Sequence, residues 1–549
     1  MKRTGLLLAL SLLVMSCATM QASGPELLGR AAKAMGGADT LGGVKTIQMK
    51  GTARQWEPEQ SLVAGGEMRF ANEATFDAVT DVTTGASRID WVRKFEYPAP
   101  RTFTFSELVT PDAGYVAGID SNGRNKQSLE SNPPAHSMSG LRLATSQREL
   151  RRGSPLLVLD MLKNPDRLAA ASPVTIGGVI YPAADYRVGD QTFTVLFDPS
   201  TSLPARVRTL DYDNIWGDVT YDLVLSDWKA VDGVQVAMSR KYELSGKTIM
   251  DVKITEAKIN APIAADRLTI PAAFKMGAAK PASGPVPYQW VIRRQFIGTY
   301  LDSDSPSYDT KATSGLRLEE RAVGVQHVVG GSHNSLIVEM KEYLIVFDAP
   351  VSDWQANWIL NAAKTKYPNK PVRFLVLTHH HMDHTGGVRA FAAQGATIVV
   401  GQGNGEHFRR VLAAPFKRNP DLSSRDLTGT PVAEVSDKRI FSDGTREVGV
   451  YLIDNPHANG LLIGYVADAK IGFVTDIWSP GAGALPDKLN PALASLVAGV
   501  KKNGLAPAKF AGGHGSIADY APLAALEGEV VRGGITRSTR GGMRCLRRF

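Results

Sequence analysis

The first half of the chain alternates between apolar and polar residues with the period of a β-strand. Between 250 and 255, Met, Val and Ile alternate with Asp, Lys and Thr. Residues 192–197 form another such run, which ends at a turn and is followed by a partner run over 205–210. Pro25 to Met35 has helical spacing and predicts one opening helix, with strands from there to about residue 273. The pattern predicts an antiparallel, mostly-β domain over residues 23–277.

The second half alternates strand-like and helix-like runs, and it follows a segment rich in proline and glycine. Residues 278–287 contain four Pro or Gly among ten, which predicts a linker. Beyond it, 336–340 and 343–347 are predicted as a hairpin, whereas 388–394 is predicted as a helix. This alternation predicts a layered α/β domain over 288–527.

The formal net charge of +8 lies mainly at the two ends of the chain. Lys2 and Arg3 contribute +2, and residues 528–549 contribute +5 through six Arg and one Glu. The body over 23–527 therefore carries only about +1 and has no basic cluster, which argues against a nucleic-acid partner. The basic tail 528–549 lacks hydrophobic periodicity and is predicted to be disordered.

The first 22 residues have the layout of an export signal. Lys2 and Arg3 precede an apolar core over residues 6–15, which is too short to span a bilayer permanently. Residues 14–17 resemble a bacterial lipoprotein box in which Cys17 would be lipidated, and cleavage after Ala18 or Ala22 is the alternative. We therefore expect an exported protein, either periplasmic or an outer-membrane lipoprotein, with membrane contact only through Cys17.

A histidine-rich segment follows the apolar run 374–377. It carries four candidate metal ligands in the pattern His-x-His-x-Asp-His, and three more candidates lie downstream, each at or just past an apolar run or a turn. The seven are His379, His381, Asp383, His384, His457, Asp476 and His514. Neutral imidazoles and carboxylates are ligands that zinc accepts, and iron or manganese also suit this donor set.

These motifs resemble those of the metallo-β-lactamase superfamily, over roughly residues 323–520. The resemblance implies an αββα sandwich with metals bound by loops along one edge. It further implies that three histidines (His379, His381 and His457) bind a first metal. A second metal would be bound by Asp383, His384 and His514, and Asp476 would bridge the pair. Asp383 and Asp476 are thereby the candidate catalytic carboxylates, and the expected cofactor is two zinc ions per chain.

A bridged metal pair would lower the pKa of a shared water from about 15.7 toward roughly 7. The sequence therefore predicts a hydrolase that uses a metal-bridging hydroxide on a small-molecule ester, lactone, amide or lactam. One alternative is a mononuclear iron oxidoreductase acting on a sulfur substrate, in which Asp383 and His384 do not bind the metal. The other is a periplasmic apolar-ligand-binding protein whose metal domain is inactive.

The N-terminal half resembles the incomplete, half-open β-barrels of lipoprotein carriers and related periplasmic lipid-binding domains. That resemblance implies an apolar concave face able to hold a lipid or another apolar ligand. In the metal domain, Asp348 is expected to support the histidine-rich loop. His333 is expected either to approach the metals or to bond to backbone, and His380 is expected to contact solvent or neighbouring residues instead of binding a metal.

Overall fold

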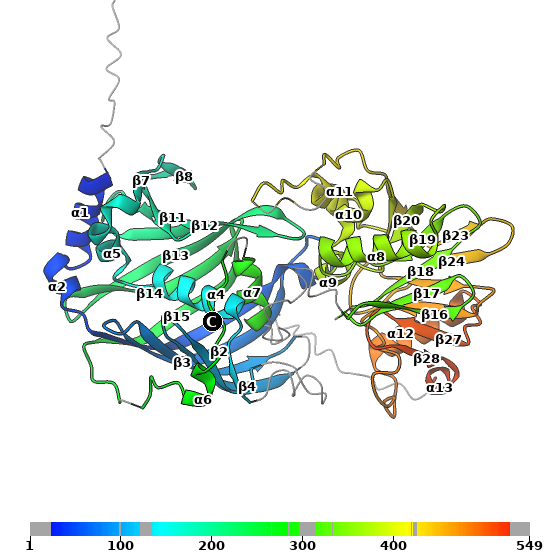
Figure 1. The fold of residues 1–549 in the computed structure, drawn as a ribbon, viewed down its shortest axis with the longest axis horizontal. Coiled ribbons are helices and arrows are strands. Elements are labelled where there is room, and N and C mark those ends of the chain that lie inside the picture. Colours follow the sequence, from blue (N-terminus) through cyan, green and yellow to red (C-terminus); the bar gives the residue numbers. More distant parts are fainter. Residues whose placement is uncertain are drawn as a thin grey trace, which may run out of the picture.

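The computed structural model describes residues 24–97, 100–120, 134–264, 266–283, 286–296, 315–331, 333–418, 420 and 425–527. The predicted signal peptide over 1–22, with Cys17, and the predicted basic tail over 528–549 lie outside these ranges. Among the described residues, no helix combines the length and apolar character needed to cross a membrane. Figure 1 shows two units side by side, a large sheet domain on the left and a layered domain on the right.

A 13-stranded sheet makes up most of the N-terminal domain, and every neighbouring pair in it is antiparallel. The strand order is β6-β5-β4-β3-β2-β1-β15-β14-β13-β12-β11-β10-β7, so β15, the last of these strands in the sequence, pairs with β1, the first. The strands are β1 (Thr46–Glu57), β2 (Arg69–Asp81), β3 (Ala86–Phe95), β4 (Arg101–Val109), β5 (Gly114–Gly118), β6 (Ala135–Ser137), β7 (Leu168–Ala170), β10 (Ala183–Val188), β11 (Gln191–Phe197), β12 (Pro204–Asp213), β13 (Gly217–Val231), β14 (Val234–Leu244) and β15 (Lys247–Ile259). A separate hairpin joins β8 (Val174–Ile176) and β9 (Val179–Tyr181).

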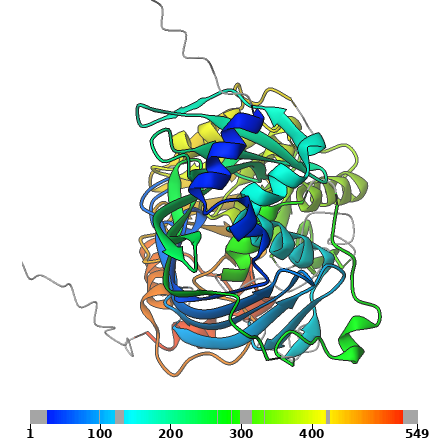
Figure 2. The ribbon, with the colours of Figure 1, turned by 90° about the vertical axis from the view of Figure 1, so that its left-hand side faces the viewer.

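Short helices pack against this sheet. They are α1 (Gly24–Ala34), α2 (Ala38–Gly42), the 3-10 helix η1 (Pro58–Gln60), α4 (Gly140–Arg152), α5 (Leu157–Lys163), the 3-10 helix η2 (Pro165–Arg167), α6 (Ala272–Lys275) and α7 (Tyr288–Phe296). Helix α4 contacts β4 and α7, and α7 contacts β12 near the other end of the strand order. The sheet therefore curves around these two helices, as Figures 1 and 2 show.

The prediction of strands throughout residues 36–273 is wrong over α4 and α5. The buried face of α4 carries Arg142, Arg148 and Arg152, so no apolar period marks the segment as a helix. Each arginine instead has an acidic neighbour within ion-pair distance, such as Asp211, whose Oδ1 lies 2.8 Å from Arg148 Nη1. A prediction from hydrophobic periodicity places charged residues at the surface, so it does not recognise a helix whose buried face carries paired charges.

The C-terminal domain is an αββα sandwich, as predicted. Its first sheet has the order β16-β17-β18-β19-β20-β21-β22, and its second has the order β23-β24-β25-β26-β27-β28. The strands are β16 (Arg317–Ala322), β17 (Val325–Val329), β18 (Ser335–Glu339), β19 (Leu344–Phe347), β20 (Val372–Val376), β21 (Thr397–Gly401), β22 (Val432–Val435), β23 (Lys438–Ser442), β24 (Glu447–Leu452), β25 (Leu462–Val466), β26 (Ile471–Val474), β27 (Lys509–Gly512) and β28 (Ile517–Asp519). The helices are α8 (Asp353–Lys366), α9 (Met382–Thr385), α10 (Val388–Ala393), α11 (Gly405–Ala413), α12 (Pro491–Lys502) and α13 (Ala521–Ala524).

Three apolar layers hold this sandwich together. A central cluster joins the facing sides of the two sheets, with Phe347 and Phe374 from the first and Phe473 from the second. A second cluster covers the outer face of the first sheet with α8, α10 and α11. A third packs α12 on the outer face of the second sheet. Burying both faces of each sheet is the layer arrangement that excludes water from an α/β domain.

The two domains share a continuous contact surface. Ile215, in the turn between β12 and β13, is buried among core residues of the C-terminal domain, together with Trp290 and Val291 of α7. Beside it, Asn214 Nδ2 donates a hydrogen bond of 2.7 Å to the Val351 carbonyl. Helix α7, which the sequence places at the start of the C-terminal domain, therefore packs on both domains.

Candidate metal centre

The histidine-rich loop leaves the end of β20 and is held by a buried aspartate. Asp348 is fully buried and accepts hydrogen bonds from the Thr378 backbone N–H at 2.7 Å and the Thr378 hydroxyl at 2.9 Å. Its Oδ2 also lies 3.2 Å from Nδ1 of His384. Asp348 therefore orients both the start of the loop and one of its histidines, as the sequence predicted.

Three histidines and one carboxylate converge on a first point. His379, His381, His457 and Asp476 each offer one ligand atom, and these atoms lie within 4.8 Å of one another. His381 Nδ1 is buried without a hydrogen bond to any described residue, and His379 Nε2 and His457 Nε2 face only the Asp476 carboxylate. A buried nitrogen lone pair without a partner is unfavourable unless a cation takes that place. The donor set therefore fits a metal ion.

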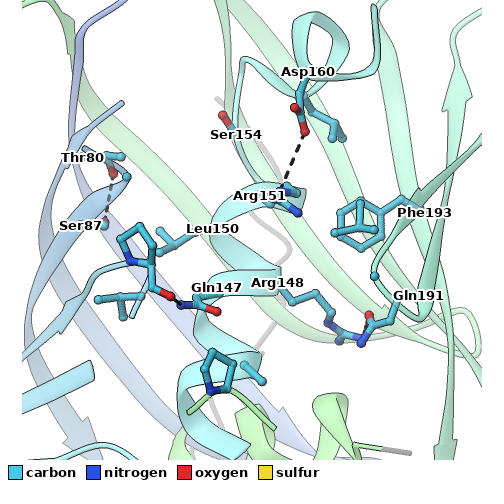
Figure 3. Close-up of a pocket in the computed structure, with 18 of the residues that line it drawn as sticks. Thr80, Ser87, Gln147, Arg148, Leu150, Arg151, Ser154, Asp160, Gln191 and Phe193 are labelled. Carbon is cyan, nitrogen blue, oxygen red and sulfur yellow. Dashed lines mark hydrogen bonds and ion pairs between the residues drawn. The ribbon is translucent and has the colours of Figure 1, made fainter. Parts of the chain in front are cut away.

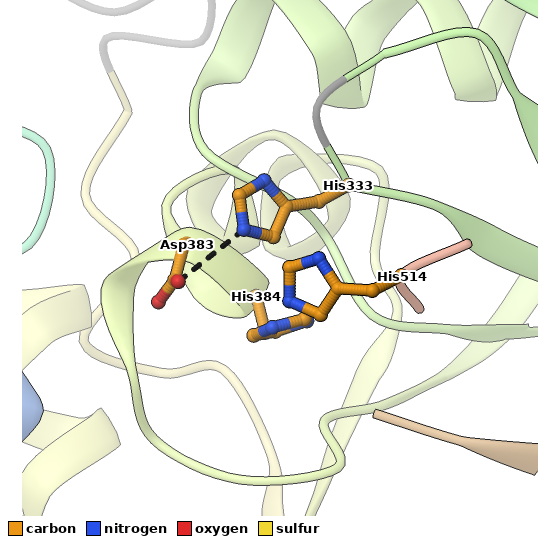
Figure 4. Close-up of side chains that lie close together, drawn as sticks. All are labelled: His333, Asp383, His384 and His514. Carbon is orange, nitrogen blue, oxygen red and sulfur yellow. Dashed lines mark hydrogen bonds and ion pairs between the residues drawn. The ribbon is translucent and has the colours of Figure 1, made fainter. Parts of the chain in front are cut away.

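A second group lies beside the first. His333, Asp383, His384 and His514 also offer ligand atoms within 4.8 Å of one another. Figure 4 shows these four side chains pointing toward a common region. His333 Nε2 lies 3.3 Å from Asp383 Oδ2, and its ring centroid lies 4.5 Å from that of His514. Three imidazoles and a carboxylate form a donor set that suits a borderline divalent metal.

Asp476 lies between the two groups and presents one oxygen to each. Its Oδ2 is 3.1 Å from His379 Nε2 and 2.8 Å from His457 Nε2. Its Oδ1 is 2.9 Å from His384 Nε2 and 2.6 Å from His514 Nε2. This two-sided placement is the geometry that a bridging carboxylate requires.

The site is strongly polarised even without a cation. Burial lowers the pKa of His379 to about 3 and holds that of His381 well below its usual range, so both rings are neutral at pH 7. Burial also opposes charge on His384, but the carboxylates of Asp476, Asp348 and Asp383 together outweigh it and raise the pKa of His384 well above its ordinary value. Because a metal ligand must be deprotonated, a cation bound here would displace the His384 proton.

The structure thus brings all seven predicted residues to one site and adds His333 to them. In the sequence, the signal for this position of His333 is its place just before β18, a strand that the sequence predicts. The neighbouring Asn334 bonds to backbone, donating 3.0 Å hydrogen bonds to the carbonyls of Gly512 and Gly515 on either side of His514.

His380 is not exposed to solvent. It is 3% exposed, and its Nε2 lies 2.9 Å from the Ser61 carbonyl oxygen.

The glycines around the loops permit close backbone approach. A Cβ on Gly386 would lie 2.1 Å from the Val351 carbonyl oxygen, and one on Gly513 would lie 2.1 Å from Cγ2 of Thr475. The collisions that these glycines avoid are therefore with neighbouring loops of the protein.

Comparison with known proteins gave one matching family profile and several similar solved structures. The sequence profile described as the metallo-beta-lactamase superfamily matches residues 328–514. A search of curated proteins returned no significant match. Among solved structures, a metallo-beta-lactamase from Pontibacter korlensis is similar at 22% identity, covering 38% of this chain and 98% of its own, with a TM-score of 0.28. One from Hirschia baltica has 19% identity, coverage of 38% and 95%, and a TM-score of 0.29.

A third similar structure is a stereoselective inverting sec-alkylsulfatase from Pseudomonas sp., with 17% identity, coverage of 38% of this chain and 40% of its own, and a TM-score of 0.30. The likenesses all involve little more than a third of the present chain. The profile match spans β17 to the loop that carries His514 and so includes the candidate ligands. The profile match identifies residues 328–514, the part of the C-terminal domain that carries the candidate metal centre, as a metallo-beta-lactamase superfamily domain.

Proposed function

We propose that this chain is an exported, metal-dependent hydrolase with two zinc ions, acting on a small ester, lactone, amide or lactam. The observation that carries the proposal is Asp476, which directs one oxygen to each of two ligand groups. Two such groups around a shared carboxylate favour a dinuclear site over the mononuclear iron alternative. Asp383 and His384 also lie inside the second group, where that alternative would leave them without a metal.

In this proposal, the candidate ligands of the chain bind two metal ions, and the neighbouring carboxylates hold and orient them. His379, His381 and His457 would hold one cation, and His333, Asp383, His384 and His514 would hold the other. Bound divalent cations supply Lewis acidity, which acidifies water and polarises a carbonyl group. Asp476 would keep the two cations together and offset part of their charge. Asp348 would keep His384 oriented by facing its Nδ1, so that Nε2 is presented to the site.

The test is the metal content of the purified mature protein, measured without added metal by inductively coupled plasma mass spectrometry. We expect about two zinc ions per chain, together with metal-dependent hydrolysis of a lactam, lactone or nitrophenyl ester panel that chelation abolishes. One iron per chain would instead favour oxygen-dependent sulfur chemistry. A chain that binds no metal even after reconstitution would contradict the proposal.

The export part of the proposal rests on the charged start and apolar core over residues 1–15. Fractionation of cells that express the full chain should place the mature protein outside the cytoplasm. The intact mass of its N-terminal peptide separates lipidation at Cys17 from cleavage after Ala18 or Ala22. A full-length chain retained in the cytoplasm would contradict export.

A second candidate function, binding of an apolar ligand, is favoured by cavities in the N-terminal domain. One cavity of about 260 Å³ has walls that include Met49, Phe76, Trp91 and Met250. A second, of about 870 Å³, shares Leu150 with it and is drawn in Figure 3. The apolar side chains of the first cavity suit an acyl chain or a similar group, and the second cavity adds polar residues such as Gln147 and Arg151.

The ligand can be tested directly, because a bound lipid survives gentle purification and is identified by native mass spectrometry after organic extraction. Leu150→Trp, which adds bulk at a residue that lines both cavities, should reduce its retention. Exposed Ile180, at 62% exposure, provides the control Ile180→Trp. Absence of any extractable ligand, with no binding of a fluorescent fatty acid, would exclude this second function.

A further inference from the structure

The connection between β1 and β2 reaches from the N-terminal domain to the metal loop. This segment, residues 58–68, is called the β1–β2 connection below. Gln60 Nε2 donates a 2.9 Å hydrogen bond to Asp383 Oδ1 across 323 positions of sequence. The Ser61 carbonyl oxygen lies 3.1 Å from His381 Nε2. The next residue, Leu62, accepts a 2.7 Å hydrogen bond from the Asn459 backbone N–H, near His457.

The orientation of the Gln60 amide follows from its second partner. The Tyr97 hydroxyl donates a hydrogen bond to Gln60 Oε1. Because the oxygen is engaged by Tyr97, the NH₂ group is the end that faces Asp383. The Asp383 carboxylate is thus contacted by Gln60 at Oδ1 and by His333 at Oδ2, which restrains both of its oxygens.

The Ser61 carbonyl has a comparable effect on His381. A carbonyl oxygen only accepts, so the imidazole nitrogen facing it must carry the proton. With Nε2 protonated, the buried Nδ1 keeps its lone pair and has no hydrogen bond to a described residue, so it is the His381 atom available to a metal in the first ligand group. Partners of this kind on the far side of a ligating histidine fix its tautomer and ring orientation.

The base of the β1–β2 connection is itself firmly held. Arg293 of α7 lies 2.8 Å from Glu59 and 3.7 Å from Glu57, and all three side chains are at most 2% exposed. The same arginine lies 3.3 Å from Asp213, two residues before the buried Ile215. Both segments that meet the metal domain are therefore bound to one guanidinium, which limits their movement.

From these contacts we infer that the N-terminal domain forms part of the metal centre, with Gln60 and the Ser61 carbonyl as positioning groups for Asp383 and His381. The inference rests on the proposed function, because it assumes that Asp383 and His381 bind metal. It assigns the N-terminal domain a direct part in the site, in addition to any ligand that its own cavities hold. An ordered metal pair then requires both domains of the chain.

The test compares Gln60→Met with wild type in the full chain. Methionine keeps the length of the side chain and removes the donor to Asp383. We expect the affinity for the second metal to fall about 10- to 100-fold in chelator competition, as is typical when such a partner is lost. The visible spectrum of the cobalt-substituted protein should change in parallel, and the first metal should remain bound.

Gln48→Met is the matched control. Gln48 lies near the start of β1, the strand that leads into η1 and Gln60, and its Nε2 donates to the carbonyls of Ala261 and Pro262 in the N-terminal domain. Tyr97→Phe is a second variant that removes only the group orienting Gln60, and it should shift second-metal affinity in the same direction by a smaller factor. It also keeps the inference testable if Gln60→Met folds poorly.

The outcomes separate the two proposals. If wild type binds two metals and hydrolyses substrate, but Gln60→Met and Tyr97→Phe match Gln48→Met in second-metal affinity and cobalt spectrum, this inference is overturned and the hydrolase proposal stands. If wild type binds no metal, both are overturned. Selective loss of the second metal in Gln60→Met, with unchanged circular dichroism, supports the inference.

Discussion

Three non-glycine residues with left-handed backbone cluster around the metal centre. Asp348, Val351 and Asp476 have φ values of 60°, 62° and 58°. A β-branched residue such as Val351 is rare in this conformation, which costs roughly 1–3 kcal/mol. Asp348 faces His384, Asp476 faces both ligand groups, and Val351 accepts from Asn214. Each strained residue thus makes a contact on which the site or the domain interface depends.

Asp476→Ala should abolish the bridge between the two ligand groups. We expect loss of one metal and a fall in kcat/KM beyond about 100-fold, since even outer partners of ligands cost 10–100-fold when lost. The fold should survive, because Asp476 lies in a loop. Metal analysis and steady-state kinetics check this, with Asp468→Ala, an exposed aspartate in the turn between β25 and β26, as the control. Unchanged turnover would contradict a bridged pair.

Glu107→Gln should weaken the N-terminal domain in a pH-dependent way. Burial would raise the pKa of Glu107, but the Arg142 guanidinium 2.7 Å away, together with Arg93 and the Trp91 hydrogen bond, outweighs burial and lowers that pKa. The ion pair therefore adds stability above the unfolded pKa of about 4.3 that is lost as the pH falls through the folded value.

We expect the free energy of unfolding of the variant to be about 1.5–3 kcal/mol lower than that of wild type at pH 7, which is the typical contribution of a hydrogen bond between charged groups. The difference in unfolding free energy between wild type and variant should become smaller below about pH 4. Urea denaturation at pH 7 and below about pH 4 measures this difference, and Glu73→Gln at an exposed position is the control. A gap that is constant with pH would show that Glu107 is not stabilised as a carboxylate.

At the scale of elements, short helices and loops position the ligands. Helix α9 carries Asp383 and His384, and its C-cap Gly386 has an ordinary helical φ of −58°. The reason for a glycine there is space, since the Val351 backbone lies against it. The sequence indicates a glycine pair after the histidines, but the element against which it packs is visible only in the fold.

Gly386→Ala should push α9 away from the Val351 turn. We expect a loss of about 1–3 kcal/mol in unfolding free energy, the range for overpacked sites, together with weaker binding of the second metal. Gly29→Ala in α1 is the control, and it should raise the unfolding free energy instead of lowering it. Nothing lies within 4 Å of a Cβ added at Gly29, and alanine favours a helix over glycine by about 0.5–1 kcal/mol. Equal stability of the two variants in urea would contradict the packing argument.

At the scale of the whole molecule, the two domains are joined by the β12–β13 turn and the β1–β2 connection. Ile215 is 1% exposed within the core of the C-terminal domain, and Asp218 accepts hydrogen bonds from the backbone N–H groups of Lys417 and Arg418 at 3.1 and 3.0 Å. An interface that includes core packing makes the domains a single cooperative unit.

Ile215→Ala should loosen that unit. Emptying a buried isoleucine site costs about 2–4 kcal/mol, and here the cost falls on the interface between the domains. We expect the single urea transition of wild type to split when each domain is followed by its own fluorescent probe. Ile180→Ala on the exposed β9 should leave one transition. A split already present in wild type would show that the interface is weak.

The sandwich, the mostly-β domain and the residues that converge on the metal centre were readable from the chain. A metal centre needs particular donor atoms. The residues that carry them lie on short loops after apolar strands, so their type and spacing can be recognised in the sequence. The place of α4, the choice for His333 between approaching the metals and bonding to backbone, and the contact of Gln60 with Asp383 could not be predicted. They depend on which distant segments meet, which is decided by burial and paired charges across the whole fold and leaves no local period in the sequence.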